Sequence, residues 1–334
     1  MFTLRARRLA VATLSAVALT AAGCAPAGLE SSPAPAGSQT APTAASPTAV
    51  ASPSALASPT PTAAPSPTAS PTPSVPASAS ATPTATPSSR PSYTGDPNAI
   101  VKGSNHIGSA EAYVYPAQLV QQWLEGEVKP TEKIVFLTFD DGPNQTTTPI
   151  ILDALKEAGV HATFYVIGSN VGDNPDLLKQ ELAEGHAINL HSWSHDYKKL
   201  YPGRKANAER VESEYVKTLE AVQSILGPEF NTEGWRYPGG HMSWKNMAGA
   251  DEALASHGVH WVDWNADTRD SAPKSSRPSS VDEMVQNATE PIRAGFHVAV
   301  ILGHDTPDKT LTAKSVPAII AAYKEAGFKF GVIS

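Results

Sequence analysis

Two neighbouring aspartates, Asp140 and Asp141, follow an apolar run at residues 134–137 within the sequence TFDDGP. The run predicts a buried strand that ends at the two acids. Adjacent carboxylates repel each other, and a turn needs only one of them. A hydrolytic metal site can use both, because one carboxylate binds the metal while its neighbour takes a proton from the attacking water. Both acids stay ionised if positive charge is near, and a metal ion together with Arg236 would supply it.

Two histidines, His191 and His195, stand four residues apart in the sequence HSWSH. If this segment forms a helical turn, both imidazoles lie on one face, and the spacing suits two ligands of one metal. An isolated pair of this kind is more often two solvated histidines on a polar loop. Here the pair follows one predicted strand and the double aspartate follows another, which favours a metal site.

Apolar runs and amphipathic segments alternate along the C-terminal part of the chain. The predicted strands comprise residues 133–139, 160–167, 186–190, 234–237, 259–264, 297–302 and 328–333. The predicted helices comprise residues 149–158, 175–184, 207–226, 245–256, 281–293 and 313–326. Continuous apolar strands separated by helices are typical of a parallel sheet that is covered on both faces.

The positions of the ionisable residues decide between an open sheet and a barrel. In an open sheet, ligands bind at a switch point that only a few strands reach, whereas in a barrel all strand ends meet at one mouth. An ionisable residue stands at or just after the C-terminal end of five predicted strands, namely Asp140, His191, Arg236, Asp267 and His304. We therefore expect an α/β fold, a distorted (β/α) barrel with about seven parallel strands, fewer than the usual eight.

The motifs at these strand ends resemble those of a known family. In chain order, TFDDGP, HSWSH, RYPGG, WNADTRD and LGH are similar to the five motifs of the polysaccharide deacetylases, carbohydrate esterase family 4. That family includes peptidoglycan N-acetylglucosamine deacetylases and chitin deacetylases, and the resemblance covers the whole globular part of the chain. It implies the distorted (β/α) barrel that is typical of the family.

The resemblance implies a metal-binding and base-bearing half of the site. Asp140 would be the general base, and Arg236 would hold it in place. Asp141, His191 and His195 would bind one divalent metal, most simply zinc, with cobalt, iron or manganese as alternatives. Such an ion polarises an amide carbonyl, which is otherwise a poor electrophile, and acidifies water.

The resemblance also implies an acid-bearing half. His304 would be the general acid that protonates the leaving amine, and Asp267 would keep it charged. The N–H of Gly239 would help to bind the oxyanion, with Tyr237 beside it at the substrate. Leu302 would line the pocket for the acetyl methyl group.

The sequence departs from the family pattern at Ser271, where a tryptophan is usual. We expect Trp261 or Trp264 to form the hydrophobic wall in its place. The other histidines considered are expected to be structural or solvated: His161, His186, His257, His260 and His297.

The N-terminal residues predict export and lipid anchoring. A basic segment at residues 5–8 precedes an apolar stretch at residues 9–22, which is too short to span a bilayer and fits a signal peptide. Small residues then lead to Cys24, the only cysteine, as in the lipobox of bacterial lipoproteins. We expect a signal peptide at residues 1–23, a lipid on Cys24 and a location on the extracellular face of the cell membrane. An ordinary secretory signal with an incidental cysteine is the alternative.

A linker rich in Ala, Ser, Pro and Thr is predicted for residues 24–102, and residues 25–92 hold 16 of the 30 prolines. Such a segment has too little apolar surface to offset its ordering entropy, so we expect disorder. In the polyproline II conformation residues 25–92 would reach roughly 200 Å when fully extended. That length suits a tether that carries the catalytic domain, residues 103–334, through a cell wall.

Several functions remain open. The leading hypothesis is a metal-dependent hydrolase that removes N-acetyl groups from cell-wall glycan, most simply from N-acetylglucosamine of peptidoglycan. An O-acetyl esterase acting on acetylxylan or acetylated wall polymer is the main alternative. A non-catalytic glycan-binding relic would lack the base, the acid or a ligand, and none is missing. A non-haem iron oxygenase also uses two histidines and a carboxylate, but the second aspartate disfavours it.

The charge balance bears on partners. With 25 basic and 32 acidic residues the net charge is −7, which gives no sign of nucleic-acid binding. The expected partners are peptidoglycan or a related N-acetylated glycan and, through Cys24, the membrane. The protein is expected to be a monomer.

Overall fold

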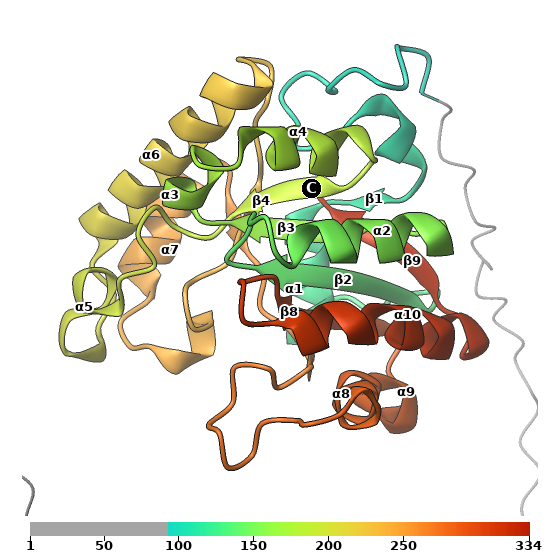
Figure 1. Cartoon of the computed structure of the whole chain (residues 1–334). Helices are drawn as coiled ribbons and strands as arrows, with labels where there is room; N and C mark the ends of the chain where they lie inside the picture. Colours follow the sequence, from blue (N-terminus) through green and yellow to red (C-terminus); the bar gives the residue numbers. More distant parts are fainter. Residues whose placement is uncertain (1–92) are drawn as a thin grey trace, which may run out of the picture. The chain divides into compact units, whose positions relative to one another are not determined.

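The computed structural model describes residues 93–334 (Figure 1). The predicted signal peptide, Cys24 and the linker up to residue 92 lie outside the described residues. The described part begins ten residues before the predicted domain start at Gly103. Within it, Ile100 pairs with Ile107 in an antiparallel bridge. Nowhere between residues 93 and 334 is a helix long and apolar enough to cross a membrane.

The core of the fold is a nine-stranded sheet whose ladders between strands are all parallel. The strands are β1 (Val114–Tyr115), β2 (Ile134–Asp140), β3 (Thr163–Val166), β4 (Ala187–Leu190), β5 (Gly234–Trp235), β6 (His260–Trp261), β7 (Ala266–Asp267), β8 (Val298–His304) and β9 (Lys329–Ile333). Each of the seven predicted strand regions contains a strand, and the two-residue strands β1 and β7 are additional. The expected distorted (β/α) barrel is confirmed.

Strand β2 is the centre of the sheet. One of its edges pairs with β8 along its whole length. The other edge pairs with β9 at Ile134–Phe136 and with β3 at Thr138–Asp140. From β3 the sheet continues through β4 and β5 to β6, while β7 extends it beyond β8. Among the described strands no ladder joins β6 to β7, so the barrel stays open there.

Alternation along β2 and β8 separates two apolar layers. Val135, Leu137 and Ile301 belong to the larger layer, which the outer helices cover. Phe136 and Val300 belong to the smaller inner layer. Because successive side chains point to opposite faces of a strand, Thr138 and Asp140 continue the inner side of β2. In the same way, Leu302 and His304 continue the inner side of β8. The side chains of Asp140 and His304 therefore lie directly above the inner apolar layer of the barrel.

Ten α-helices are found in the described residues. They are α1 (Ala117–Glu125), α2 (Thr148–Ala158), α3 (Gly168–Val171), α4 (Pro175–Ala183), α5 (Tyr197–Leu200), α6 (Ala208–Leu226), α7 (Ala248–Ala255), α8 (Val281–Ala288), α9 (Glu290–Ala294) and α10 (Thr310–Glu325). The helix predicted at residues 281–293 is divided into α8 and α9, because Pro291 starts a new helix. Helices α1, α3 and α5 were not predicted.

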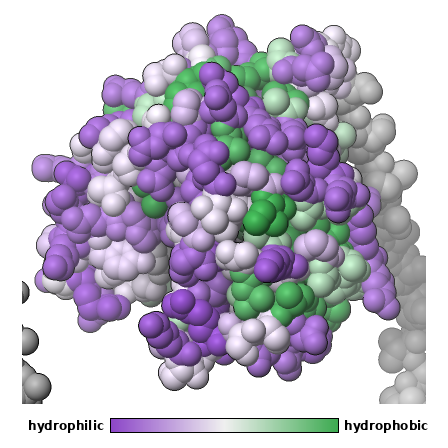
Figure 2. Space-filling view, viewed as in Figure 1, coloured by the Kyte–Doolittle hydropathy of each residue, from purple (hydrophilic) through white to green (hydrophobic). Residues whose placement is uncertain are grey.

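The helices cover the two layers differently. Helix α10 packs against α2 and α8 on the outer side of the sheet, and α6 packs against α7. Helix α1 contributes Ala117 and Val120 to the inner layer. The face viewed in Figure 2 is mostly hydrophilic, with hydrophobic side chains gathered toward the right, where Figure 1 draws α2 and α10.

Candidate metal centre and active site

Three predicted ligands meet at the C-terminal ends of β2 and β4. One oxygen of Asp141 lies 3.6 Å from Nε2 of His191 and 3.4 Å from Nε2 of His195. One ligand atom from each residue lies within 4.8 Å of the other two. Asp141 and His195 both have positive φ, 79° and 51°, so the chain bends sharply at both to direct these side chains inward.

The hydrogen bonds of His191 leave the correct nitrogen available. Its Nδ1 lies 2.7 Å from the backbone carbonyl of Arg236, which can only accept, so Nδ1 carries the proton. Burial, followed by the neighbouring His195, lowers the pKa of His191 to about 3. The imidazole is therefore neutral at physiological pH, and the lone pair of Nε2 faces Asp141.

These residues fit a small divalent cation. Oδ1 of Asp141 is buried and has no hydrogen-bond partner among the described residues. An orphaned carboxylate oxygen of this kind is costly unless a cation or water satisfies it. In tetrahedral zinc sites with bonds of about 2.0–2.1 Å, ligand atoms are about 3.3 Å apart. The spacings around Asp141 are close to that value.

The loop that carries both histidines is tied to helix α6. Glu214, which is buried in α6, accepts hydrogen bonds from the amides of Trp193 and Ser194 and from the Ser194 hydroxyl. Arg210 pairs with the same carboxylate at 2.6 Å. Burial opposes ionisation, but these hydrogen bonds and Arg210 lower the pKa of Glu214. The sequence offered no local signal for this anchor, because it lies some twenty residues beyond the histidines.

The predicted base is held by the predicted arginine. Nη1 of Arg236 donates to Oδ1 of Asp140 at 2.8 Å and to the Thr138 hydroxyl at 2.7 Å. The guanidinium also lies 3.9 Å from the centre of the Tyr165 ring. Arg236 is fully buried, and burial alone would lower its pKa, but Asp140 and other neighbours raise it. Oδ2 of Asp140 remains directed toward His191, 3.6 Å from its Nε2.

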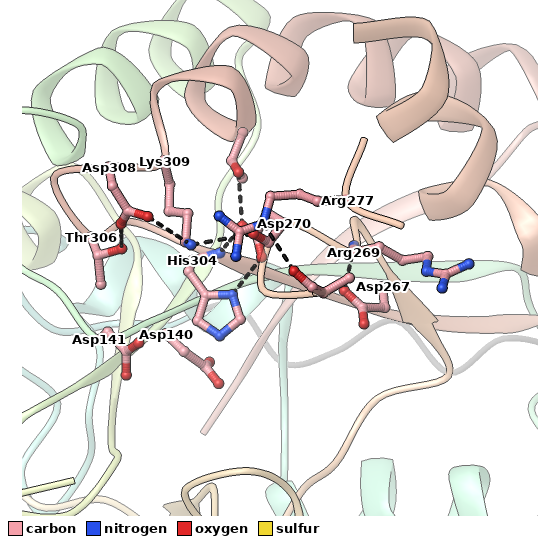
Figure 3. A network of polar contacts seen from close by, with 12 residues as sticks. Asp140, Asp141, Asp267, Arg269, Asp270, Arg277, His304, Thr306, Asp308 and Lys309 are labelled. Carbon is pink, nitrogen blue, oxygen red and sulfur yellow. Dashed lines mark hydrogen bonds and ion pairs between the residues drawn. The ribbon is translucent and has the colours of Figure 1, made fainter. Parts of the chain in front are cut away.

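Strand register places His304 opposite the base. Asp140 and His304 are paired positions of the parallel ladder between β2 and β8. Both side chains belong to the inner face of the barrel. In Figure 3 the imidazole of His304 lies between Asp270 on one side and Asp140 with Asp141 on the other.

The partner of His304 is Asp270, so the prediction that Asp267 keeps it charged was wrong. Nδ1 of His304 lies 2.7 Å from Oδ1 of Asp270, and the His304 amide donates to Oδ2 of the same carboxylate. Thr312 also donates to that carboxylate. Burial alone would lower the pKa of His304, but Asp270, together with Asp140 and Asp141, raises this pKa to about 9. The imidazole is therefore cationic at neutral pH.

Asp267 ends β7 three residues earlier and turns to its own loop. Its Oδ1 accepts the amide of Arg269 at 2.6 Å (Figure 3). Burial raises the pKa of this carboxyl. The motif WNADTRD contains both aspartates, and only the path of the turn after β7 distinguishes them.

The motif RYPGG forms a turn beside the metal ligands. Gly239 and Gly240 have φ values of 80° and 82°, a backbone conformation that residues other than glycine rarely adopt. Asp263 fixes this turn by accepting the amides of His241 and Met242. Burial raises the pKa of Asp263. The role predicted for the Gly239 N–H stays a prediction.

Two further predicted substrate residues are placed differently. Leu302 lies on the inner face of β8, two residues before His304, where an acetyl pocket would be. The side chain of Tyr237 is fully buried, and its hydroxyl donates to Asp251 at 2.8 Å. The side chain therefore packs in the core, and only the backbone of Tyr237 could lie beside a substrate, so the role predicted for this residue stays a prediction.

Tryptophans border the turn where Ser271 does not. Ser271 is exposed in the loop after Asp270. The ring of Trp264 covers Gly240 so closely that an added Cβ would lie 2.7 Å from it, and it lies 5.6 Å from Arg236. Trp261 instead stacks on His241 at 3.9 Å. Of the two candidates, Trp264 is the one beside the site.

A second buried acid, Asp305, was also missed. It follows His304, and its Oδ2 accepts a hydrogen bond from Thr148 at 2.6 Å. Its backbone carbonyl accepts from the side chains of Asn144 and Thr147. Burial raises the pKa of Asp305 to about 7. These bonds tie the loop after Asp141 to the end of β8.

Comparison with known proteins supports a common ancestry. The sequence profile described as polysaccharide deacetylase matches residues 127–253, which include Asp140, the three ligands and Arg236. A peptidoglycan-N-acetylglucosamine deacetylase of Bacillus cereus is 34% identical over 208 residues, covering 59% of this chain and 68% of that protein. The enzyme of that name from Listeria monocytogenes is 34% identical over 203 residues, but only 38% of its length is covered.

Solved structures of CE4 esterases and polysaccharide deacetylases are also similar to this chain. A CE4 esterase of Streptococcus mutans is similar with a TM-score of 0.66 and 42% identity, covering 72% of this chain and 100% of that chain. A polysaccharide deacetylase of Bacillus cereus is similar with a TM-score of 0.52 and 32% identity, covering 60% of this chain and 91% of that chain.

We expect the purified protein to bind one divalent ion per chain. Asp141→Ala and His195→Ala should each lose it, because each removes one of three ligands. Zinc content after dialysis against limiting zinc, measured by atomic absorption, checks this. His257→Ala, which removes a histidine paired with Glu212, is the matched control and should keep the ion. Equal zinc contents in all four proteins would contradict the assignment.

The pKa of His304 should depend on Asp270. In Asp270→Asn the imidazolium loses its anionic partner, so its pKa should fall from about 9 toward the ordinary 6.5. NMR titration of the ring resonances measures the pKa. Asp267→Asn is the control and should leave it nearly unchanged, whereas a larger fall in that variant would restore the original assignment.

Proposed function

This chain belongs to the polysaccharide deacetylase family, and we propose that it hydrolyses the N-acetyl groups of N-acetylglucosamine units in peptidoglycan. The observation that carries the proposal is the arrangement around the three metal ligands. Asp140 lies on one side of them and cationic His304 lies close by, each held by its own buried partner. An amide hydrolase needs a base and an acid in opposite protonation states at the same time.

Asp140 is suited to accept the proton of the attacking water. Arg236 binds Oδ1 of Asp140, which leaves Oδ2 free on the side of the ligand cluster. Since Arg236 is also bonded to the Val262 carbonyl and the Thr138 hydroxyl, the base cannot swing away. Proton transfer from water to Oδ2 leaves hydroxide to attack the acetamide carbonyl carbon.

His304 is suited to protonate the leaving nitrogen. Its Nδ1–H is bonded to Asp270, so the proton that it can deliver is on Nε2. When the C–N bond breaks, its electron pair stays on the sugar nitrogen, which takes this proton and leaves as an amine. The acetyl group leaves as acetate. The products are therefore a free amino sugar and acetate.

Asp141, His191 and His195 would hold a divalent metal, which when bound would polarise the acetamide oxygen and lower the pKa of water at the site. Two imidazole nitrogens and one carboxylate oxygen at this spacing favour zinc as the ion. The N–H of Gly239 is proposed to donate to the developing oxyanion.

The names of similar proteins support N-acetylglucosamine of peptidoglycan as the substrate. Proteins named peptidoglycan-N-acetylglucosamine deacetylase are about one-third identical to this chain, and a chitooligosaccharide deacetylase of Bradyrhizobium is 33% identical. The CE4 esterase of Streptococcus mutans makes an ester substrate the competing proposal. A wall-bound substrate also agrees with the proposed location, on the extracellular face of the membrane through a lipid on Cys24.

Peptidoglycan fragments treated with the zinc-loaded protein should lose one acetyl group from glucosamine, as measured by mass spectrometry. A chelator should abolish the loss. Asp140→Asn should lower the rate by about 10²–10⁴-fold, because the base is removed while its geometry is kept. The Asp267→Asn protein is the matched carboxylate control. Activity on acetylxylan without any loss from glucosamine would favour the esterase instead.

Membrane attachment should depend on Cys24. In cells, the parent protein should fractionate with membranes and take up labelled fatty acid. Cys24→Ser removes the only thiol that could carry the lipid, so it should incorporate no label and leave the membrane fraction. A Cys24→Ser protein that stays membrane-bound would rule out the anchor.

A further inference from the structure

A tyrosine outside the five motifs lies beside the metal ligands. Tyr197 is the first residue of α5, two residues after His195, and the centres of the two rings are 5.1 Å apart. Asp196 caps this short helix by accepting the amides of Lys198 and Lys199. The position of Tyr197 is therefore fixed relative to the ligand.

The phenol end of Tyr197 reaches the RYPGG turn. A Cβ added to Gly239 would lie 3.3 Å from the Tyr197 hydroxyl and 3.1 Å from the Trp244 ring. The Trp244 ring meets Tyr197 edge-on at 5.2 Å, and its Nε1 donates to the Pro238 carbonyl at 2.8 Å. Tyr197 thus lies between a metal ligand and the peptide that we propose binds the oxyanion.

The hydroxyl of Tyr197 is free to bind a ligand. No partner for it is found among residues 93–334, whereas the buried Tyr237 hydroxyl is bonded to Asp251. The Tyr197 side chain is also one of the few large apolar groups of the described part that is exposed, with 43% of its surface accessible. An exposed ring with an unpaired hydroxyl, held rigidly at the mouth of a site, suits a ligand that has both apolar faces and hydroxyl groups.

We propose that Tyr197 is a substrate-binding residue, whose ring forms a wall of the sugar pocket and whose hydroxyl hydrogen-bonds the N-acetylated sugar. The inference rests on the proposed function, because it names the recognition element of the same site. Sugar rings present C–H faces that pack against aromatic rings and polar edges that bond to a phenol. The competing explanation is that Tyr197 only supports His195 by packing, and the two roles have different consequences.

Two variants separate the hydroxyl from the ring. Tyr197→Phe keeps the ring and removes the hydroxyl, and Tyr197→Ala removes both. The substrates are a β-1,4-linked tetramer of N-acetylglucosamine and 4-nitrophenyl acetate, which has no sugar. Tyr197→Phe should raise KM for the tetramer about fivefold to tenfold, as expected for one lost hydrogen bond. Tyr197→Ala should raise it further, and both variants should keep the parent rate on 4-nitrophenyl acetate and the parent zinc content.

Tyr93→Phe removes a hydroxyl from another exposed tyrosine and is the matched control, expected to behave as the parent. Unchanged KM for the tetramer in both Tyr197 variants would overturn the inference. So would an equal loss on both substrates together with lost zinc, because that is the result of a structural role.

Failure of the proposed function and failure of the Tyr197 inference give different results. If the parent releases acetate neither from the tetramer nor from peptidoglycan fragments, the proposed deacetylation is wrong. The inference is then judged by calorimetric binding of the tetramer to Asp140→Asn proteins with and without Tyr197→Ala. Weaker binding in the double variant supports it, and equal binding overturns it.

Discussion

The buried ion pair of Arg236 and Asp140 is the constraint on which the site depends. The guanidinium bonds Thr138 and Asp140 of β2 and the carbonyl of Val262 after β6, and it lies over the Tyr165 ring of β3. One side chain thus joins three separate strands at the mouth of the barrel. Removing either partner would leave a buried charge unpaired, which typically costs about 3–5 kcal/mol. The base is therefore positioned by the same contact that holds the strand ends together.

The site holds its base, Asp140, deprotonated and its acid, His304, protonated, although the two residues are neighbours across one ladder. Asp140 and His304 are paired positions of β2 and β8. Each receives a separate buried partner, Arg236 for the carboxylate and Asp270 for the imidazole. Arg236 follows β5 and Asp270 follows β7. Because the two partners lie on different loops, the surroundings of Asp140 or of His304 can change without moving the other residue.

Much of this arrangement could be predicted from the sequence because buried parallel strands are continuous apolar runs. The C-terminal end of such a run is also where a barrel collects its polar side chains, so Asp140, His191 and His304 could be identified. The choice between Asp267 and Asp270 could not be made, since it depends on a turn of irregular backbone after a two-residue strand. Tyr197 was missed for a related reason: α5 is a single turn whose position follows from its cap and from tertiary contacts.

The carboxylate of Glu214 has a consequence for how the protein opens. It belongs to α6, yet the amides that it binds belong to the loop between the two histidine ligands. Local unfolding of this helix would therefore release the loop and the cation together. By thermodynamic linkage, cation binding stabilises the helix in return. Depletion of the ion by a chelator would thus loosen helix α6 and increase its amide hydrogen exchange.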